Sequence, residues 1–303
     1  MSVILLLVII LQSKIFDLLK MTKNNSFLYL NIAGDTSDCC GDSCCADELN
    51  VEITHDQLDS MTASIQHYYG IFATSALDRV VDSKHIPSTD KFYTQDQREV
   101  LPAEAAGASA GCGNPLGVAN AALGEIVMDL GSGGGVDCFI AAKEVGDEGF
   151  VIGIDMTPHM LELARKNAEK LGTENVVFKL GHIESIPQPD DTVDLIISNC
   201  VIALSQRKDR VFSEIFRILK PGGRFVISDM VTSDAIPSNV QKSPNEWVAC
   251  VGGAAVMSEY IEMIGDIGFS DIEILKEEQS RPYADDWQST LINLTLRAYK
   301  PHD

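Results

Sequence analysis

The chain has 303 residues, 45% of them hydrophobic, and carries 44 acidic against 23 basic side chains for a formal net charge of −21. This length allows one large α/β domain with an appendage, and the apolar content is sufficient for a substantial core. A negative field of this size repels phosphate backbones and anionic membranes, so we expect no nucleic-acid partner.

The first 50 residues combine an apolar run with a polar, cysteine-rich stretch. Residues 3–11 are apolar with no basic residue before them, which is too short to span a bilayer and unlike a good signal peptide. A weak signal, a cryptic targeting segment and a true start at Met21 all stay open. We expect a cytoplasmic protein without a membrane span, with residues 1–50 as an arm outside the fold. Four cysteines cluster in this arm: Cys39, Cys40, Cys44 and Cys45.

The next 74 residues, 51–124, are interpreted as a cap that precedes the regular part of the chain. A helix is predicted over 54–82, with Tyr68-Tyr69-Gly70 inside or ending it. Residues 83–110 mix Pro, Ser, Asp and Ala without a strong period, which favours loops and short helical pieces.

From residue 125 onward, apolar strands alternate with helices of about ten residues. The predicted strands are 125–131, 150–156, 176–180, 193–200 and 224–230, and the predicted helices are 135–145, 158–171 and 207–219. A long connection over 231–256, a helix over 258–267 and closing strands over 271–276 and 290–299 follow. This alternation predicts an α/β fold, with a mostly parallel seven-stranded sheet and helices on both faces. Residues 125–230 form its core, and 231–303 carry an insertion that closes over the substrate.

A glycine-rich turn, residues 129–135 (DLGSGGG), follows the first predicted strand. Glycines there let the backbone approach a ligand, and Asp155 ends the second strand, where a carboxylate can accept both ribose hydroxyls of an adenosine. Dinucleotide-binding dehydrogenases also have a glycine-rich turn after the first strand and an acid at the end of the second, so these two features alone do not identify the ligand. Asp129 before the first glycine, the missing third glycine of G-x-G-x-x-G and the LKPGG turn at 219–223 favour S-adenosylmethionine and a class I methyltransferase (Rossmann-like) core. Candidate donor-binding residues are Asp129, Gly131, Ser132, Gly133, Gly135, Asp155, Met156, Ile183, Glu184 and Asn199, with core packing as the alternative for Met156 and Ile183.

Three further cysteines lie in segments that can reach the carboxyl ends of the strands. Cys200 ends the fourth strand, Cys112 lies in a Gly/Pro loop before the core, and Cys250 lies in the insertion. Three thiolates from three loops would form a soft, three-coordinate pocket, whereas structural zinc usually takes four ligands with short local spacing. These cysteines are our candidate acceptor site. A methyltransferase of small organic acceptors such as quinones or sterols, with structural cysteines, and a thiol-based sensor without turnover are the alternatives. Cys138 is predicted to be a core residue.

The segments around these residues resemble the arsenite methyltransferases over roughly 107–300. The motifs that carry the resemblance are GCGNP at 111–115, DLGSG at 129–133, GIDMT at 153–157, ISNCVI at 197–202, LKPGGR at 219–224 and LRAYKP at 296–301. The resemblance implies that Cys112, Cys200 and Cys250 bind As(III) as substrate, that arsenite and methylarsenite are methylated through the arsenic lone pair, and that thioredoxin or glutathione sustains turnover. We expect a monomer. The chain departs from the family at Ala203, where Asn is common, and lacks a cysteine shortly after Tyr68-Tyr69-Gly70.

Overall fold

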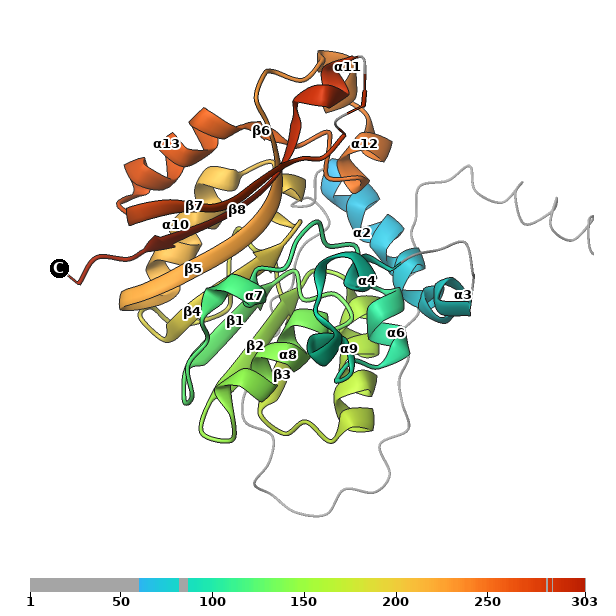
Figure 1. The fold of residues 1–303 in the computed structure, drawn as a ribbon, viewed down its shortest axis with the longest axis vertical. Helices are drawn as coiled ribbons and strands as arrows, with labels where there is room; N and C mark the ends of the chain where they lie inside the picture. The colour runs from blue at the N-terminus through green and yellow to red at the C-terminus, as the bar shows by residue number, and fades with distance from the viewer. Residues whose placement is uncertain (1–59, 82–86, 282, 285, 303) are drawn as a thin grey trace, which may run out of the picture. The chain divides into compact units, whose positions relative to one another are not determined.

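The computed structural model describes residues 60–81, 87–281, 283–284 and 286–302 (Figure 1). All of them belong to one unit, Thr54–Asp303. The arm predicted over 1–50 and the beginning of the helix predicted over 54–82 lie outside the described residues.

Within the described part of the chain, eight strands form one sheet. Seven lie on a continuous path in the order β3–β2–β1–β4–β5–β8–β7, and β8 runs antiparallel to both of its neighbours. The predicted mostly parallel seven-stranded sheet is therefore confirmed, and one short strand is added to it. This strand, β6, lies inside the predicted connection and pairs in parallel with β5. It was not predicted because two residues are too few to show an alternating pattern. The strands are β1 Ile126–Leu130, β2 Phe150–Asp155, β3 Val176–Leu180, β4 Val193–Asn199, β5 Leu219–Thr232, β6 Ala255–Val256, β7 Ser270–Gln279 and β8 Leu291–Tyr299.

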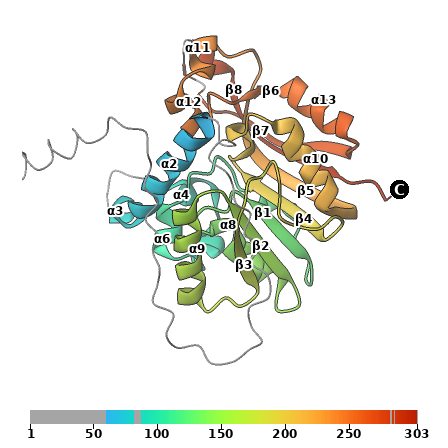
Figure 2. The same cartoon turned by 180° about the vertical axis from the view of Figure 1, so that it is seen from behind.

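Helices cover both faces of the sheet, as Figures 1 and 2 show from opposite sides. The strands at the centre bury both sets of their alternating side chains, which is why they read as nearly continuous apolar runs. On one face α8 Val136–Val145 and α9 Pro158–Leu171 pack against the strands, and on the other face α10 Lys208–Ile218 and α13 Met257–Ile267 do so. None of the described helices is long and apolar enough to cross a bilayer.

Further helices form the cap and the insertion. The cap contains α2 Ser60–Thr74, α3 Ala76–Val81, α4 Ser88–Phe92, α5 Gln95–Arg98, α6 Ala103–Gly107 and α7 Leu116–Ala119. The insertion contains α11 Ser238–Gln241 and α12 Pro244–Val248, and a 3₁₀ turn at Trp287–Thr290 precedes β8. Another 3₁₀ turn, Ile202–Leu204, follows β4. The helix predicted over 54–82 is interrupted at Ser75. The Arg79 Nε donates to the Gly107 carbonyl at 2.8 Å and joins α3 to α6.

The strand predicted over 224–230 begins earlier than expected. α10 ends at Ile218, and Leu219 already pairs with Val193 of β4. Residues 220–223 interrupt the pairing with β4, which passes from Leu219–Val193 to Arg224–Leu195 with a shift of register. Gly222 adopts φ of +79° there, and its N–H donates to the Lys300 carbonyl at 2.9 Å. The turn sequence therefore forms an irregularity within β5 and does not separate the helix from the strand.

Aromatic rings fasten the α10 and α13 layer to the sheet. The Phe212 ring lies 5.2 Å from Tyr260 of α13 and 5.9 Å from Phe225 of β5, measured between ring centroids, and all three are buried. Such contacts stabilise beyond their apolar area. Phe212 of α10 therefore packs against both α13 and β5.

Phe212→Ala should lower the free energy of unfolding by about 3–5 kcal/mol, because it opens a cavity that the packed rings cannot fill. Urea denaturation measures this. Phe150→Ala serves as the matched control, since Phe150 is 39% exposed at the start of β2 and should cost about 1 kcal/mol or less. Equal losses in the two variants would contradict the packing role of Phe212.

Candidate active site

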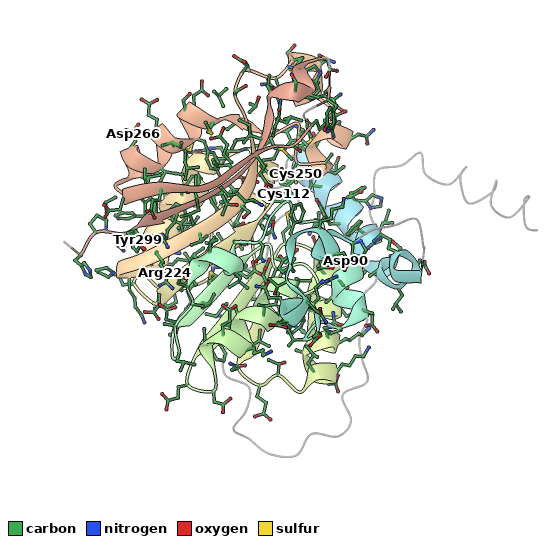
Figure 3. All side chains as sticks on the ribbon, in the orientation of Figure 1. Asp90, Cys112, Arg224, Cys250, Asp266 and Tyr299 are labelled. Atoms are coloured by element: carbon green, nitrogen blue, oxygen red, sulfur yellow. The ribbon has the colours of Figure 1, made fainter. Side chains whose placement is uncertain are left out.

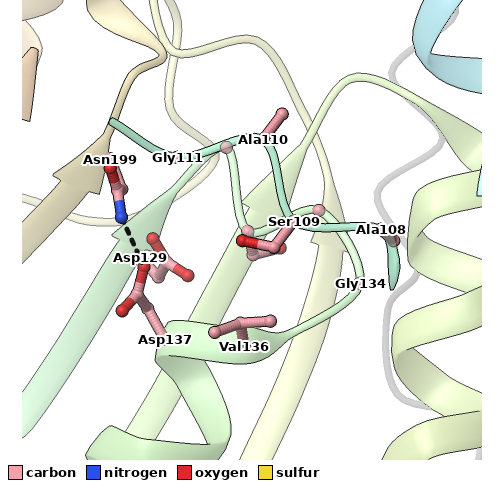
Figure 4. A pocket seen from close by; sticks show the side chains of 12 residues that line it. Ala108, Ser109, Ala110, Gly111, Asp129, Gly134, Val136, Asp137 and Asn199 are labelled. Carbon is pink, nitrogen blue, oxygen red and sulfur yellow. Dashed lines mark hydrogen bonds between the residues drawn. The ribbon is translucent and has the colours of Figure 1, made fainter. Parts of the chain in front are cut away.

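The direction of the chain across the sheet changes between β1 and β4. Strands β1, β2 and β3 follow one another outward, and β4 then returns to pair with the other side of β1. Parallel sheets bind ligands at such a point, outside the carboxyl ends of the strands. A pocket lies there (Figure 4), lined by Ala108, Ser109, Ala110, Gly111, Asp129, Gly131, Ser132, Gly133, Gly134, Val136, Asp137 and Asn199. Five of the predicted donor-binding residues are among them: Asp129, Gly131, Ser132, Gly133 and Asn199.

The glycine turn and Asp155 hold each other in place. Gly131 and Gly133 have φ of +72° and +50°, which other residues adopt only with strain. The Asp155 carboxylate accepts the Gly133 N–H at 2.9 Å and the Thr157 N–H at 2.7 Å. Burial raises the pKa of Asp155, and these two backbone bonds oppose the rise. Asp155 thus ties the turn after β1 to the loop after β2.

Ser132 supplies an unpaired polar atom at this turn. Its Oγ is buried and has no hydrogen-bond partner among the described residues. Buried hydroxyls are nearly always paired in folded proteins, so an orphan that lines a pocket indicates a ligand. The residues present therefore fit a polar donor such as S-adenosylmethionine.

The other predicted donor-binding residues do not line this pocket. Gly135 is the N-cap residue of α8, and Met156 is half-buried with its carbonyl accepting a hydrogen bond from Gln66 Nε2 at 2.7 Å. Ile183 packs in the core beneath α10, and Glu184 accepts a hydrogen bond from Ser205. Their roles in donor binding, and that of Asp155, stay predictions.

Two buried carboxylates beneath the pocket face each other. Burial, and then the nearby charge of Asp137, raises the pKa of Asp129 well above its usual range, and Cys138 Sγ donates to Asp129 at 3.3 Å. Burial raises the pKa of Asp137 to about 6, although hydrogen bonds from Tyr93 and Asn199 oppose it. Asp137 and Tyr93 were not predicted. An acid in the first turn of an otherwise apolar helix is a signal for Asp137, whereas nothing in the sequence indicates Tyr93.

The three predicted acceptor cysteines come from three separate segments and gather at the end of β4. Cys112 and Cys250 lie close together in Figure 3, and the Cys200 thiol interacts with both of theirs. Cys112 is half-buried, and Cys200 and Cys250 are buried. The three thiols are free, and we refer to them as the thiol cluster.

Tight backbone geometry brings the thiol cluster together. Cys200 and Cys250 adopt φ of +62° and +61°, a left-handed conformation that costs roughly 1–2 kcal/mol for residues other than glycine. The glycines beside Cys112 allow close approach, because a Cβ at Gly111 would lie 2.5 Å from Asn199 Nδ2 and one at Gly113 would lie 2.6 Å from the Ser228 side chain. Strain that persists in this way is typical of functional sites.

Each thiol has its own partners in this structure. Cys112 Sγ lies 3.8 Å from the Ser228 carbonyl, and Cys250 Sγ donates to the Cys200 carbonyl at 3.1 Å. The pKa of Cys200 is raised well above its usual range by its contact with Cys112 and by burial, and that of Cys250 by its contact with Cys200 and by burial. Among the described residues, no group of three His, Cys, Asp or Glu side chains is arranged to hold a metal ion.

Charged and phenolic groups that were not predicted surround the thiol cluster. Burial raises the pKa of Asp229 to about 6, against the opposing charge of Lys208, and Tyr260 donates to its carboxylate at 3.1 Å. Burial lowers the pKa of Lys208 to about 8, and its ammonium donates to the Ser205 carbonyl at 2.7 Å. Tyr69 reaches the cluster from α2 and donates to the Val248 carbonyl at 3.1 Å. Asp229 is an acid inside the apolar strand β5, a signal that the sequence already contains.

Several known proteins are similar to this chain. Residues 123–288 match the model of the family described as "Methyltransferase domain". The chain is 37% identical to an arsenite methyltransferase of Halobacterium salinarum over 90% of this chain and 65% of that protein, and 32% identical to one of Mus musculus over 70% and 58%. The chain thus spans less than two thirds of the length of these curated relatives. The crystal structure of an arsenic(III) S-adenosylmethionine methyltransferase from Chlamydomonas reinhardtii superposes with a TM-score of 0.56 at 30% identity, covering 75% of this chain and 73% of that one.

Asp137→Asn should flatten the pH dependence of stability in the ligand-free protein. The pKa of Asp137 is about 6 in the folded chain against an ordinary 3.8, so the folded state binds the proton more tightly. Stability from this group is therefore present at low pH and is lost as the pH rises through about 6. Between pH 5 and 7 the wild type should lose about 1 kcal/mol more than the variant. Urea denaturation at both pH values measures the difference. Asp147→Asn, at an exposed position, should keep the wild-type slope, and identical slopes in all three proteins would refute the prediction.

Asp155→Asn should weaken the binding of S-adenosylhomocysteine about tenfold or more, because one carboxylate oxygen that accepts a backbone N–H is replaced by a donor. Isothermal titration calorimetry measures the affinity, and circular dichroism checks the fold. An unchanged affinity in a folded variant would mean that the donor binds elsewhere.

Proposed function

The chain belongs to the methyltransferase domain family and, within it, to the arsenite methyltransferases, and we propose that it transfers a methyl group from S-adenosylmethionine to trivalent arsenic. The pocket outside the carboxyl ends of β1 and β4 is called the donor pocket from here on. The observation that carries this proposal is the meeting of three thiols from three separate segments directly beside it. Asn199 lines that pocket, and Cys200 is the next residue in the chain.

The donor pocket suits a cationic ligand with an adenosine group. Asp129 and Asp137 place two carboxylates beneath it, and a positive charge above them would offset their desolvation. Ser132 Oγ offers an unpaired hydrogen-bonding group, and we propose that Asp155 accepts a ribose hydroxyl in addition to its two backbone N–H groups. When bound there, S-adenosylmethionine supplies an electrophilic methyl group on a sulfonium sulfur.

The acceptor half suits a soft, three-coordinate element. Trivalent arsenic exchanges its oxygen ligands for thiolate sulfur and keeps a lone pair, which is the group that accepts the methyl cation. Cys112, Cys200 and Cys250 would orient this lone pair toward the donor, and positioning of that kind supplies most of the rate in a direct displacement. Because arsenic itself is the nucleophile, the site needs no general base to activate it.

Methyl transfer raises the oxidation state of arsenic by two, so continued turnover needs two electrons from outside the chain. We propose that a thiol reductant, thioredoxin or glutathione, supplies them. Free thiols at the acceptor site suit a reducing compartment, which supports a cytoplasmic location. We further propose that arsenite and methylarsenite are both substrates and that the protein acts as a monomer.

Cys200→Ser and Cys250→Ser should each abolish methylation of arsenite, because the hydroxyl of serine is a poor ligand for As(III). Cys112→Ser should lose arsenite but keep methylarsenite, which occupies only two thiolates. Transfer of labelled methyl groups from S-adenosylmethionine to each substrate measures these activities.

Cys138→Ser is the matched control, since its side chain is buried outside the thiol cluster and serine still donates to Asp129. It should keep measurable methylation of arsenite. The three cluster variants should bind S-adenosylhomocysteine like the wild type. Full activity of Cys200→Ser and Cys250→Ser with arsenite, or methylation of a quinone in its place, would overturn the proposal.

A further inference from the structure

The side-chain amide of Asn199 lies between the donor pocket and the Cys112 loop (Figure 4). Its Oδ1 accepts the N–H groups of Cys112 at 3.0 Å and Gly113 at 3.2 Å. Its Nδ2 donates to the Gly113 carbonyl at 2.9 Å. Asn199 therefore fixes the backbone that carries the Cys112 thiol.

The same amide nitrogen is held from the donor side. Asn199 Nδ2 also donates to the Tyr93 hydroxyl oxygen at 2.9 Å and to Asp137 Oδ2 at 3.5 Å. Tyr93 in turn donates its proton to Asp137, with its oxygen 2.8 and 2.9 Å from the two carboxylate oxygens. Tyr93 and Asp137 are both buried, so water does not replace a bond that is lost.

These bonds form one continuous path from a charge in the donor pocket to a thiol in the acceptor site. A cationic donor above Asp137 favours the ionised carboxylate in a fixed orientation, which strengthens the hydrogen bond from Tyr93. Because the Tyr93 proton is then used in the bond to Asp137, the Tyr93 oxygen can only accept hydrogen bonds. It accepts one from Asn199 Nδ2, and this bond fixes the orientation of the Asn199 amide. An amide held in this orientation keeps Asn199 Oδ1 bonded to the backbone of the Cys112 loop. The loop is then already ordered before arsenic binds, so arsenic binding no longer pays the entropy cost of ordering it.

We propose that Tyr93 and Asn199 are positioning residues that couple the donor pocket to Cys112, so that filling the donor pocket tightens the binding of arsenite. The inference rests on the proposed function, because it requires Cys112 to be a ligand of arsenic. Thermodynamic linkage makes the coupling reciprocal, so arsenite must tighten donor binding by the same factor.

The full chain is titrated with arsenite by calorimetry, with and without saturating S-adenosylhomocysteine, which fills the donor pocket without transferring a methyl group. The dissociation constant of arsenite should fall about fivefold or more when the donor pocket is filled. In Tyr93→Phe, which removes only the hydroxyl, the two constants should agree within about twofold. Phenylarsine oxide binds only two thiols. Its dissociation constant should be the same with and without S-adenosylhomocysteine in both proteins.

Val145→Ala is the stability control. It truncates a fully buried core side chain at the last residue of α8, which belongs neither to the lining of the donor pocket nor to the thiol cluster. The control should keep the wild-type ratio, which a general loss of stability in Tyr93→Phe would not predict. If Tyr93→Phe does not fold, Asn199→Ala takes its place with the same expected loss of the ratio.

The outcomes separate the two proposals. A wild type that does not bind arsenite refutes the proposed function and this inference with it. A wild type that binds arsenite equally well with and without S-adenosylhomocysteine overturns the coupling alone. A Tyr93→Phe protein that keeps the wild-type ratio of arsenite dissociation constants also overturns it, because the coupling would then not depend on the Tyr93 hydroxyl.

Discussion

β1 and β4 are hydrogen-bonded neighbours although two strands separate them in the chain, and both halves of the site depend on this pairing. Leu130 lies opposite Ser198, whose hydroxyl donates to the Leu130 carbonyl at 3.2 Å. Gly131 and Asn199 therefore leave the sheet at the same edge. A shift of one residue would exchange the buried faces of β4 and carry Cys200 away from the donor pocket. Core packing on both faces thus sets the geometry of the site.

Once that edge is set, segments before and after the core close over it. From α2, Gln66 donates to the Met156 carbonyl on the donor side, and Tyr69 donates to the Val248 carbonyl beside Cys250. The loop of Cys112 is held in turn by Asn114, whose Nδ2 donates to the Phe92 carbonyl at 3.2 Å. Through these bonds α2 and the Cys112 loop, both in the cap, contact the donor side and the acceptor side of the site. The cap is therefore part of the site.

The sequence predicted the sheet and the turns that end its strands, because buried parallel strands leave long apolar runs and glycine turns have few alternatives. It also identified Cys112, Cys200 and Cys250 as residues whose segments reach one edge, and the structure brings them there. It did not predict Tyr93, because an aromatic residue in the extended segment after a short helix carries no periodic signal, and its partner Asp137 lies 44 positions away. Lys208 was missed for a similar reason. A lysine that begins an amphipathic helix usually faces water, and only the fold of the insertion buries this one.

Under the proposed function, the charge around the site favours some arsenic species over others. Asp137 and Asp229 are buried carboxylates beside the donor pocket and the thiol cluster, within a chain of net charge −21. Anions such as phosphate or arsenate meet repulsion on approach, and in a buried site repulsion between like charges is weakly screened. Arsenous acid is uncharged near neutral pH and meets no such barrier, while a cationic donor is attracted. Under the proposed function, this negative charge favours neutral trivalent arsenic over anionic pentavalent arsenic before any thiol is engaged.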